Sequence, residues 1–149
     1  MDVLVLQVAD RRCAITLAEA SEVLPAVEVH DLPGAPAGIE GVVNVRGELV
    51  PVVGLREQMG RASREVSPEE YFVLARAGGR RMILRSDTLP VLSRLPDPIA
   101  SSDDEVGTAI AAVRPLDNGL VLLQDLAALL DDGRATRVRE LVAAQDAGT

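Results

Sequence analysis

The most constraining feature of this sequence is the stretch IEGVVNVRGELVPVVGL, which runs from Ile39 to Leu55. It contains two runs rich in valine, Gly41–Val45 and Glu48–Val53, with Arg46 and Gly47 between them. β-Branched residues favour strands, and glycine adopts the positive φ of a tight hairpin turn at low steric cost. The stretch therefore predicts a β-hairpin that carries a charged guanidinium at its tip.

Other runs along the chain predict further strands joined in hairpins. Pairs of β-prone segments separated by polar or glycine-containing turns are the usual signature, and Asn118-Gly119 is a strong hairpin signal. Because Pro51 has no N–H to donate to a ladder, we expect it at a sheet edge or a bulge. The remaining strands are expected at Val3–Val8, Cys13–Leu17, Val23–Val29, Tyr71–Ala75, Met82–Leu84, Thr88–Leu95, Ala109–Val113 and Leu120–Leu123.

The helical content is predicted to be small and to lie mostly at the C-terminal end. Leu126, Leu129 and Leu130 have the three-and-four spacing of a helix face. Helices are expected at Gln124–Leu130 and Ala135–Ala144, with short helical turns at Ala18–Glu22 and Arg56–Met59.

The composition limits the kind of core and the compartment. A chain of 149 residues is long enough for one domain. Tyr71 and Phe72 are its only aromatic residues, so the core has to be built from Val, Leu, Ile and Ala. No apolar run approaches the roughly 18 residues that cross a bilayer, and the first residues lack the pattern of a signal peptide. Cys13 is the only cysteine, which excludes an intrachain disulfide and fits a reducing cytoplasm.

Charge and side-chain chemistry argue against several classes of function. The formal net charge is −8 and all fifteen basic residues are arginine, so nucleic-acid binding is not expected. Without lysine there is no Schiff-base or phosphate-loop lysine, and no Cys and His spacing indicates a zinc site. Ser86, Asp87 and His30 could be combined into a hydrolytic triad, but this is much less expected than structural roles. We expect no cofactor, no metal and no catalysis.

Two stretches of the chain have a similar order of elements. IEGVVNVRGELVPVVGLREQMG and IAAVRPLDNGLVLLQDLAALLD each read as strand, turn, apolar strand and short helix. Each is preceded by two or three further predicted strands. With two copies and weak identity, this similarity suggests two small β-barrels of similar build that share a core.

The central stretch also carries a resemblance to a known family. Its residues Gly41, Val42, Asn44, Arg46, Gly47, Val50, Pro51, Val52 and Leu55 match the run G-V-x-N-x-R-G-x-x-V-P-V-x-x-L, which is the hallmark of CheW-type adaptors. The opening hairpin, and Glu22-Val23 after a short helical turn, are similar to the same family. The chain therefore resembles the CheW-like proteins that couple chemoreceptors to a sensory histidine kinase.

The resemblance implies a mainly β fold of two intertwined, five-stranded β-barrel lobes, with short helices and a C-terminal helix. It implies a single domain over residues 1–149. One lobe would take in residues of about 13–70, and the other about 71–123 together with the N-terminal strand. The C-terminal helices would occupy residues of about 124–144.

The resemblance also implies a cytoplasmic, non-catalytic scaffold and its partners. These would be the cytoplasmic tip of a methyl-accepting chemoreceptor and the regulatory domain of a CheA-like histidine kinase. The receptor-binding residues implied are Ala20, Glu22, Val23, Val43, Asn44, Arg46 and Gly47, and no kinase-binding residue is assigned. We expect Arg46 to pair with Glu22 beside the receptor groove. For Val43 and Val23, a place in the core and a place on the groove floor both remain open.

The second half departs from the family pattern and leaves two alternatives. It reads MILRSDTLPVL where the family has a more apolar strand, with Arg85 and Ser86 at positions that are commonly apolar. One alternative is a divergent CheW-like paralogue that binds receptors but not the kinase. The other, of a different class, is a β-barrel that binds a small ligand or catalyses a hydrolysis, which would need an internal pocket with convergent polar groups.

Overall fold

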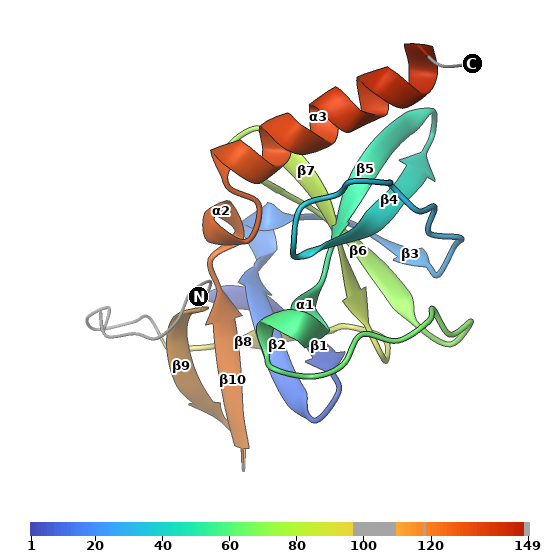
Figure 1. Ribbon diagram of the computed structural model, residues 1–149. Coiled ribbons are helices and arrows are strands. Elements are labelled where there is room, and N and C mark those ends of the chain that lie inside the picture. The colour runs from blue at the N-terminus through green and yellow to red at the C-terminus, as the bar shows by residue number, and fades with distance from the viewer. Residues whose placement is uncertain (97–109, 118, 148–149) are drawn as a thin grey trace.

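The computed structural model describes residues 1–96, 110–117 and 119–147. These residues form two five-stranded sheets with a few helices beside them (Figure 1). The prediction of a mainly β fold is confirmed.

The first sheet combines the two ends of the chain. In spatial order its strands are β8 (Val91–Arg94), β1 (Asp2–Val8), β2 (Arg11–Thr16), β10 (Gly119–Gln124) and β9 (Ile110–Leu116). β1 is antiparallel to both β2 and β8, and β10 is parallel to β2. β9 and β10 form the predicted antiparallel hairpin, although Ala109 and Asn118 themselves lie outside the described residues.

The second sheet is built from the middle of the chain. In spatial order its strands are β3 (Ala20–Pro25), β6 (Tyr71–Ala77), β7 (Arg80–Ser86), β5 (Glu48–Val53) and β4 (Ile39–Val45). β3 and β4 are therefore its two edges. The β4–β5 hairpin predicted from the central stretch is present, with Val45 opposite Glu48.

The two sheets repeat the same order of pairings. Each contains two antiparallel pairs, then one parallel pair, then a terminal antiparallel hairpin. The terminal hairpins are β4–β5 and β9–β10, and each leads into a short helix, α1 (Leu55–Gln58) and α2 (Leu126–Leu129). These are the two stretches whose similarity is visible in the sequence.

The other helical segments are η1 (Leu17–Glu19), a single 3₁₀ turn, and α3 (Asp132–Ala147). Asp125 precedes α2 as its N-cap, and its side chain accepts a hydrogen bond from the N–H of Ala128. α3 lies across the end of the second sheet, above β5 and β7 in Figure 1. In the described part of the chain, no helix is long and apolar enough to span a membrane.

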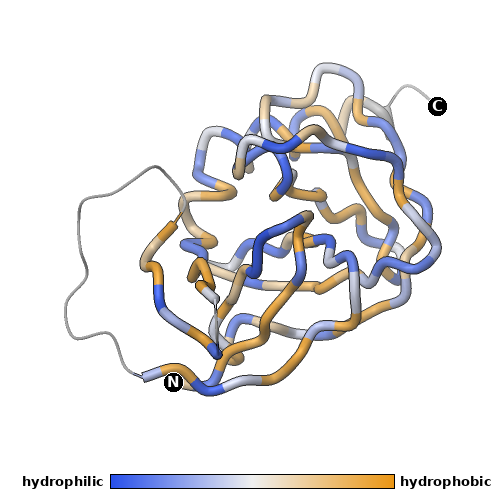
Figure 2. The backbone as a smooth tube through the Cα atoms, turned by 90° about the horizontal axis from the view of Figure 1, so that it is seen from below, coloured by the Kyte–Doolittle hydropathy of each residue, from blue (hydrophilic) through white to orange (hydrophobic). Residues whose placement is uncertain are grey.

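Three apolar clusters form the core, and aliphatic residues dominate all of them. A shared cluster receives side chains from both sheets and from the helices, including Leu6, Ile15, Val73, Leu84 and Leu126. A second cluster lies within the second sheet and a third within the first sheet. Because successive residues of a strand point to opposite faces, one face of each sheet packs on its own cluster and the other on the shared one. Figure 2 shows hydrophobic and hydrophilic segments following one another along the backbone.

The sheets divide the chain differently from the lobes expected from the sequence. Residues 71–86 were expected to belong with the C-terminal strands, but β6 pairs with β3 and β7 pairs with β5. Both strands of the N-terminal hairpin instead join the C-terminal strands, because β2 is the parallel neighbour of β10. The first sheet thus takes both ends of the chain, and residues 20–86 supply the second.

The expectation for Pro51 is wrong, and the backbone explains why. β5 lies between β4 and β7, and the register shift of β4 falls between Ile39 and Gly41. Pro51 is opposite Val42, whose N–H and C=O both bond to His30 at 2.9 and 2.8 Å. The Val42–Pro51 pair therefore exchanges no hydrogen bonds across β4 and β5, and on the other side the register of β5 with β7 begins at Val52. The missing proline N–H thus interrupts neither ladder.

Candidate functional site

The turn between β4 and β5 holds the guanidinium of Arg46 at the surface. Arg46 and Gly47 have φ values of +49° and +92°, the left-handed pair that a two-residue type I′ turn requires. Asn44 supports the turn, because its Oδ1 accepts a hydrogen bond from the N–H of Gly47 at 2.8 Å. A Cβ added at Gly47 would meet no atom within 4 Å, so backbone conformation rather than space favours glycine here.

Arg46 pairs with Glu22 of β3, as expected. Nη2 of Arg46 lies 2.7 Å from Oε1 of Glu22, and Nη1 lies 3.3 Å from Oε2. The hydrogen bonds from Arg46 lower the pKa of Glu22, and those to Glu22 raise the pKa of Arg46. The two side chains come from the opposite edges of the second sheet, so the pair connects those edges.

The pair is exposed, which decides what kind of role it can have. The side chains of Arg46 and Glu22 are 66% and 39% exposed. Ion pairs at such exposure add little to stability because water and salt screen them. A bidentate geometry nevertheless fixes where both charges lie. The arrangement is suited to presenting an oriented charge pair to a partner.

The other residues assigned to receptor binding lie in different environments. Val23 is 41% exposed and points to the opposite face of β3 from Glu22. Ala20 is half-buried against the shared cluster. Val43 is 1% exposed inside the second-sheet cluster. Of the two places left open for Val43, the core is the one observed, so its expected contact with a receptor is not available at the surface.

A neighbouring ion pair was missed by the sequence reasoning. Glu48, the first residue of β5, pairs with Arg81 of β7. Arg81 also lowers the pKa of Glu22, by less than Arg46 does, while desolvation acts in the opposite direction. Strands β3, β5 and β7 and the turn between β4 and β5 therefore bring two acidic and two basic side chains together at this corner. Strand pairing creates this cluster, and no local pattern in the sequence could reveal it.

The departure from the family pattern at Arg85 leads to a buried ionic network. Arg85 is 8% exposed and donates from Nε and Nη2 to Glu70 at 2.8 and 2.9 Å. Its Nη1 donates to Oε1 of Glu40 at 2.5 Å. Although desolvation lowers the pKa of Arg85, the two carboxylates outweigh it and raise the value. Two glutamates distant in sequence thus compensate one buried guanidinium.

The two glutamates of this network differ in their pKa. Burial raises the pKa of Glu40, and Arg85 only partly offsets that effect. Burial also raises the pKa of Glu70, but hydrogen bonds from Arg85 and from the N–H of Ser67 outweigh it and leave the value lowered. The fold therefore favours the ionised form of Glu70 and disfavours that of Glu40.

A hydrolytic site is not formed at Ser86. Its side chain is fully buried, donates to the carbonyl of Thr88 at 2.7 Å and accepts from the N–H of Gln7. His30 pairs through its backbone with Val42 and lies near Glu28. Within residues 1–96, 110–117 and 119–147, no group of three or more His, Cys, Asp or Glu could hold a metal ion.

An open cleft of about 990 Å³ lies between residues 26–31 and residues 63–68. Glu40 and Arg85 are part of its lining, but they are already bonded to each other. The cleft is open to solvent, so it is not the internal pocket that a ligand-binding barrel would need.

Comparisons with known proteins agree with this architecture. The family description "CheW-like domain" matches residues 2–134. The "Chemotaxis protein CheW" of Rhizobium meliloti (strain 1021) is 26% identical over 110 residues, which cover 70% of this chain and 71% of that protein. The "Probable chemotaxis protein CheW" of Rhizobium etli (strain ATCC 51251 / DSM 11541 / JCM 21823 / NBRC 15573 / CFN 42) is 23% identical over 139 residues, or 88% of each chain.

A solved structure has the same fold. The crystal structure of the scaffolding protein TtCheW from Thermoanaerobacter tengcongensis matches with a TM-score of 0.75. It covers 89% of both chains at 19% sequence identity. At that identity the likeness concerns the arrangement of the strands.

Proposed function

Because this chain belongs to the CheW-like family, we propose that it is a non-catalytic adaptor of chemotaxis that couples chemoreceptors to a CheA-type histidine kinase. It works in the cytoplasm and inserts no segment into the membrane. Its task is positional, since it docks on both partners at once and relates the geometry of the receptor to that of the kinase.

The observation that carries this proposal is the bidentate pair of Arg46 and Glu22. The pair lies at the surface, where it contributes little to stability, yet a supported two-residue turn fixes its geometry. A recognition surface needs charges in fixed places because electrostatic complementarity sets the orientation of a partner. Glu22, Asn44, Arg46 and Gly47 form the proposed receptor contact, and exposed Val23 extends it around the β3 edge.

The buried network argues for retention of kinase binding. The sequence departs from the family at Arg85 and Ser86, which suggested a changed partner surface. Both residues are buried, with 8% and 0% exposure, and they bond within the chain. The departure therefore changes the interior and leaves no altered side chain for the kinase to meet. On this ground we favour a complete adaptor over a receptor-only paralogue.

Binding of each partner by itself is expected to be weak. Contacts below about 1,200 Å² in total are typical of transient signalling encounters. Linking several such contacts in one assembly raises the overall strength through effective concentration, without new contacts. Weak single interactions and a stable ternary assembly are thus the expected combination.

A two-way binding experiment tests the proposal. The full chain is immobilised and offered a receptor-tip fragment, a CheA-type regulatory domain, or both together. An adaptor binds each of them and retains more of each when both are present. Capture of the receptor fragment alone would replace the proposal with the receptor-only paralogue. Failure to bind either would overturn the adaptor function.

A further inference from the structure

The segment of residues 60–65, which we call the strap, connects α1 to the region before β6 and has almost no apolar anchor. Its side chains are exposed except for that of Arg61, which is half-buried. Met59 and Val66, at its two ends, are the nearest side chains that pack on apolar clusters. Apolar burial is the usual force that holds a segment in place, so the strap needs another explanation.

Arginine–aspartate pairs supply that explanation. Nε and Nη2 of Arg61 each lie 2.8 Å from an oxygen of Asp10, in the turn between β1 and β2. Nη2 of Arg64 lies 3.1 Å from Oδ1 of Asp87, at the end of β7. In addition, the carbonyl of Glu65 accepts a hydrogen bond from Arg85 at 3.3 Å. The first residues of the strap are also bonded to α1 through the backbone, because the N–H of Gly60 donates to Glu57 at 3.0 Å and that of Arg61 to Arg56 at 2.8 Å. The side chains of the strap are held at two separate points by ionic contacts.

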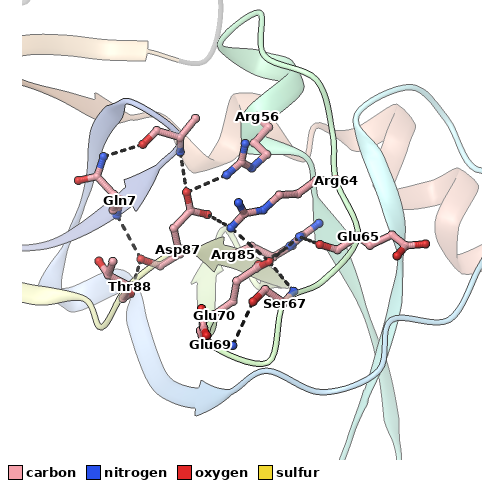
Figure 3. Close-up of polar contacts among 12 residues, drawn as sticks. Gln7, Arg56, Arg64, Glu65, Ser67, Glu69, Glu70, Arg85, Asp87 and Thr88 are labelled. Carbon is pink, nitrogen blue, oxygen red and sulfur yellow. Dashed lines mark hydrogen bonds and ion pairs between the residues drawn. The ribbon is translucent and has the colours of Figure 1, made fainter.

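The carboxylate of Asp87 bonds to groups from several elements (Figure 3). Besides Arg64, its carboxylate accepts hydrogen bonds from the N–H of Ala9 at 2.9 Å and from Arg56 at 2.7 Å. Its own N–H donates to the carbonyl of Gln7 at 2.7 Å. Only the contact with Arg64 involves the strap. The strap can therefore leave while Asp87 still joins β7 to the N-terminal hairpin.

The strap also forms part of the open cleft and lies next to the buried pair of Arg85 and Glu70. Residues 63–65 form part of one wall of the open cleft, and the facing wall comes from residues 26–31. Arg64 also lies 3.7 Å from Oε2 of Glu70, the buried partner of Arg85. Movement of the strap would widen the cleft and admit water to that buried pair.

We propose that residues 60–65 are a lid held shut by two latches, Arg61–Asp10 and Arg64–Asp87, and that this lid opens while both sheets remain folded. Apart from the backbone bonds of Gly60 and Arg61 to α1, the closed state depends on charge, because the strap contributes no buried apolar side chain. Exposed ion pairs are weakened by salt. The lid is consequently a low-stability element controlled by ionic strength on a stable scaffold.

Trypsin offers a direct readout, because Arg61 and Arg64 are themselves cleavage sites and the latches can be broken from the aspartate side. Cleavage of a transiently opened segment follows the population of the open form. The variants are Asp10→Asn and Asp87→Asn in the full chain. The control is Asp2→Asn, which removes a more exposed pair with Arg94 elsewhere on the first sheet. Mass spectrometry gives the initial rate of cleavage at each arginine.

We expect Asp10→Asn to speed cleavage after Arg61 and Arg64 by about two- to five-fold, in line with the strength of exposed ion pairs. Asp2→Asn should leave the cleavage rates after Arg61 and Arg64 unchanged. The cleavage rate after Arg76, within β6, should be the same in all variants. Raising the salt to about 0.5 M should speed cleavage of the wild type and remove its difference from Asp10→Asn.

Two results would overturn the lid. One is an unchanged rate at Arg61 and Arg64 in both Asp10→Asn and Asp87→Asn. The other is a parallel rise at Arg76, which would mean that the strap opens only when the second sheet unfolds. Asp87 also bonds to Ala9 and Arg56, so Asp87→Asn alone could weaken the fold. Besides Arg61, the carboxylate of Asp10 bonds to its own backbone N–H, which an asparagine can also accept, and it joins no other element in the described contacts. Asp10→Asn therefore decides that case.

Discussion

Arg46 and Glu22 form an ion pair between the two edges of the second sheet, with Nη2 of Arg46 and Oε1 of Glu22 2.7 Å apart. One belongs to the turn after the edge strand β4 and the other to the opposite edge strand β3. The contact therefore joins two parts of the sheet that share no backbone ladder. It creates a fixed charge pair from residues 24 positions apart in the sequence.

Reversal of the charge at Arg46 should abolish receptor binding without unfolding the chain. Arg46→Glu places two carboxylates together at the surface, and like charges at a contact repel the partner selected by the native pair. We expect loss of receptor-tip capture in a pull-down, with an unchanged circular dichroism spectrum. The control is Arg94→Glu, which reverses an exposed charge paired with Asp2 on the first sheet.

The double swap Glu22→Arg with Arg46→Glu separates geometry from polarity. It restores a salt bridge between the same two positions but reverses its direction. If the receptor recognises which of the two positions carries the positive charge, the swap will not restore capture. Full capture by Arg46→Glu would remove this pair from the receptor contact.

The glycine of the turn should matter for stability through its backbone alone. Gly47→Ala puts a Cβ on a residue with φ of +92°, where L-residues are strained, although no neighbouring atom obstructs it. We expect a loss of about 1–2 kcal/mol in the free energy of unfolding, measured by urea denaturation. Gly133→Ala, in the first turn of α3, should be neutral or stabilising because alanine favours helix. Equal effects of the two variants would contradict this account.

The local architecture around the central hairpin was predictable from the sequence. The valine runs and Arg46-Gly47 are sufficient to place β4, β5 and the turn, because strand propensity and turn geometry are local properties. The similarity of the two terminal hairpins was visible for the same reason. The position of Pro51 was predicted wrongly. A proline is tolerated there because the N–H and C=O of Val42 bond to His30 and not to Pro51.

Long-range pairings could not be predicted in this way. The partition of the chain between the sheets depends on the parallel contacts of β2 with β10 and of β5 with β7, and parallel neighbours need not be close in sequence. The polar network was equally hidden, because Arg85 meets Glu70 and Glu40 from 15 and 45 positions away. From the sequence, Arg85 was only an exception to an apolar pattern.

Removal of the buried guanidinium should destabilise the fold more than the loss of any exposed ion pair. Arg85→Met leaves Glu70, with a side chain only 1% exposed, and Glu40 without their common partner. Breaking one side of a buried pair typically costs about 3–5 kcal/mol. Chemical denaturation measures the loss, and Arg94→Met, at an 81% exposed side chain, should change stability little. A loss in Arg85→Met no larger than that of the control would show that the network contributes nothing.

The compensated replacement of that network distinguishes lost attraction from unpaired charge. In Arg85→Met combined with Glu70→Leu and Glu40→Met, no buried charge remains without a partner. Apolar replacement of a complete ion network is often neutral or stabilising. We therefore expect the triple variant to recover most of the stability lost in Arg85→Met, as measured in the same denaturation series.

Of the two glutamates in the buried network, Glu70 should make acid destabilising and Glu40 should act in the opposite direction. The folded chain lowers the pKa of Glu70, so its contribution is complete above the ordinary value of 4.5 and disappears as pH falls through the lowered pKa. The pKa of Glu40 is raised by burial, so the folded state binds its proton more readily and loses stability as pH rises through that pKa. In urea denaturation between pH 7 and pH 3, Glu70→Gln should flatten the loss of stability on acidification. Glu40→Gln should steepen it. The same slope in both variants would mean that neither carboxyl has the environment described.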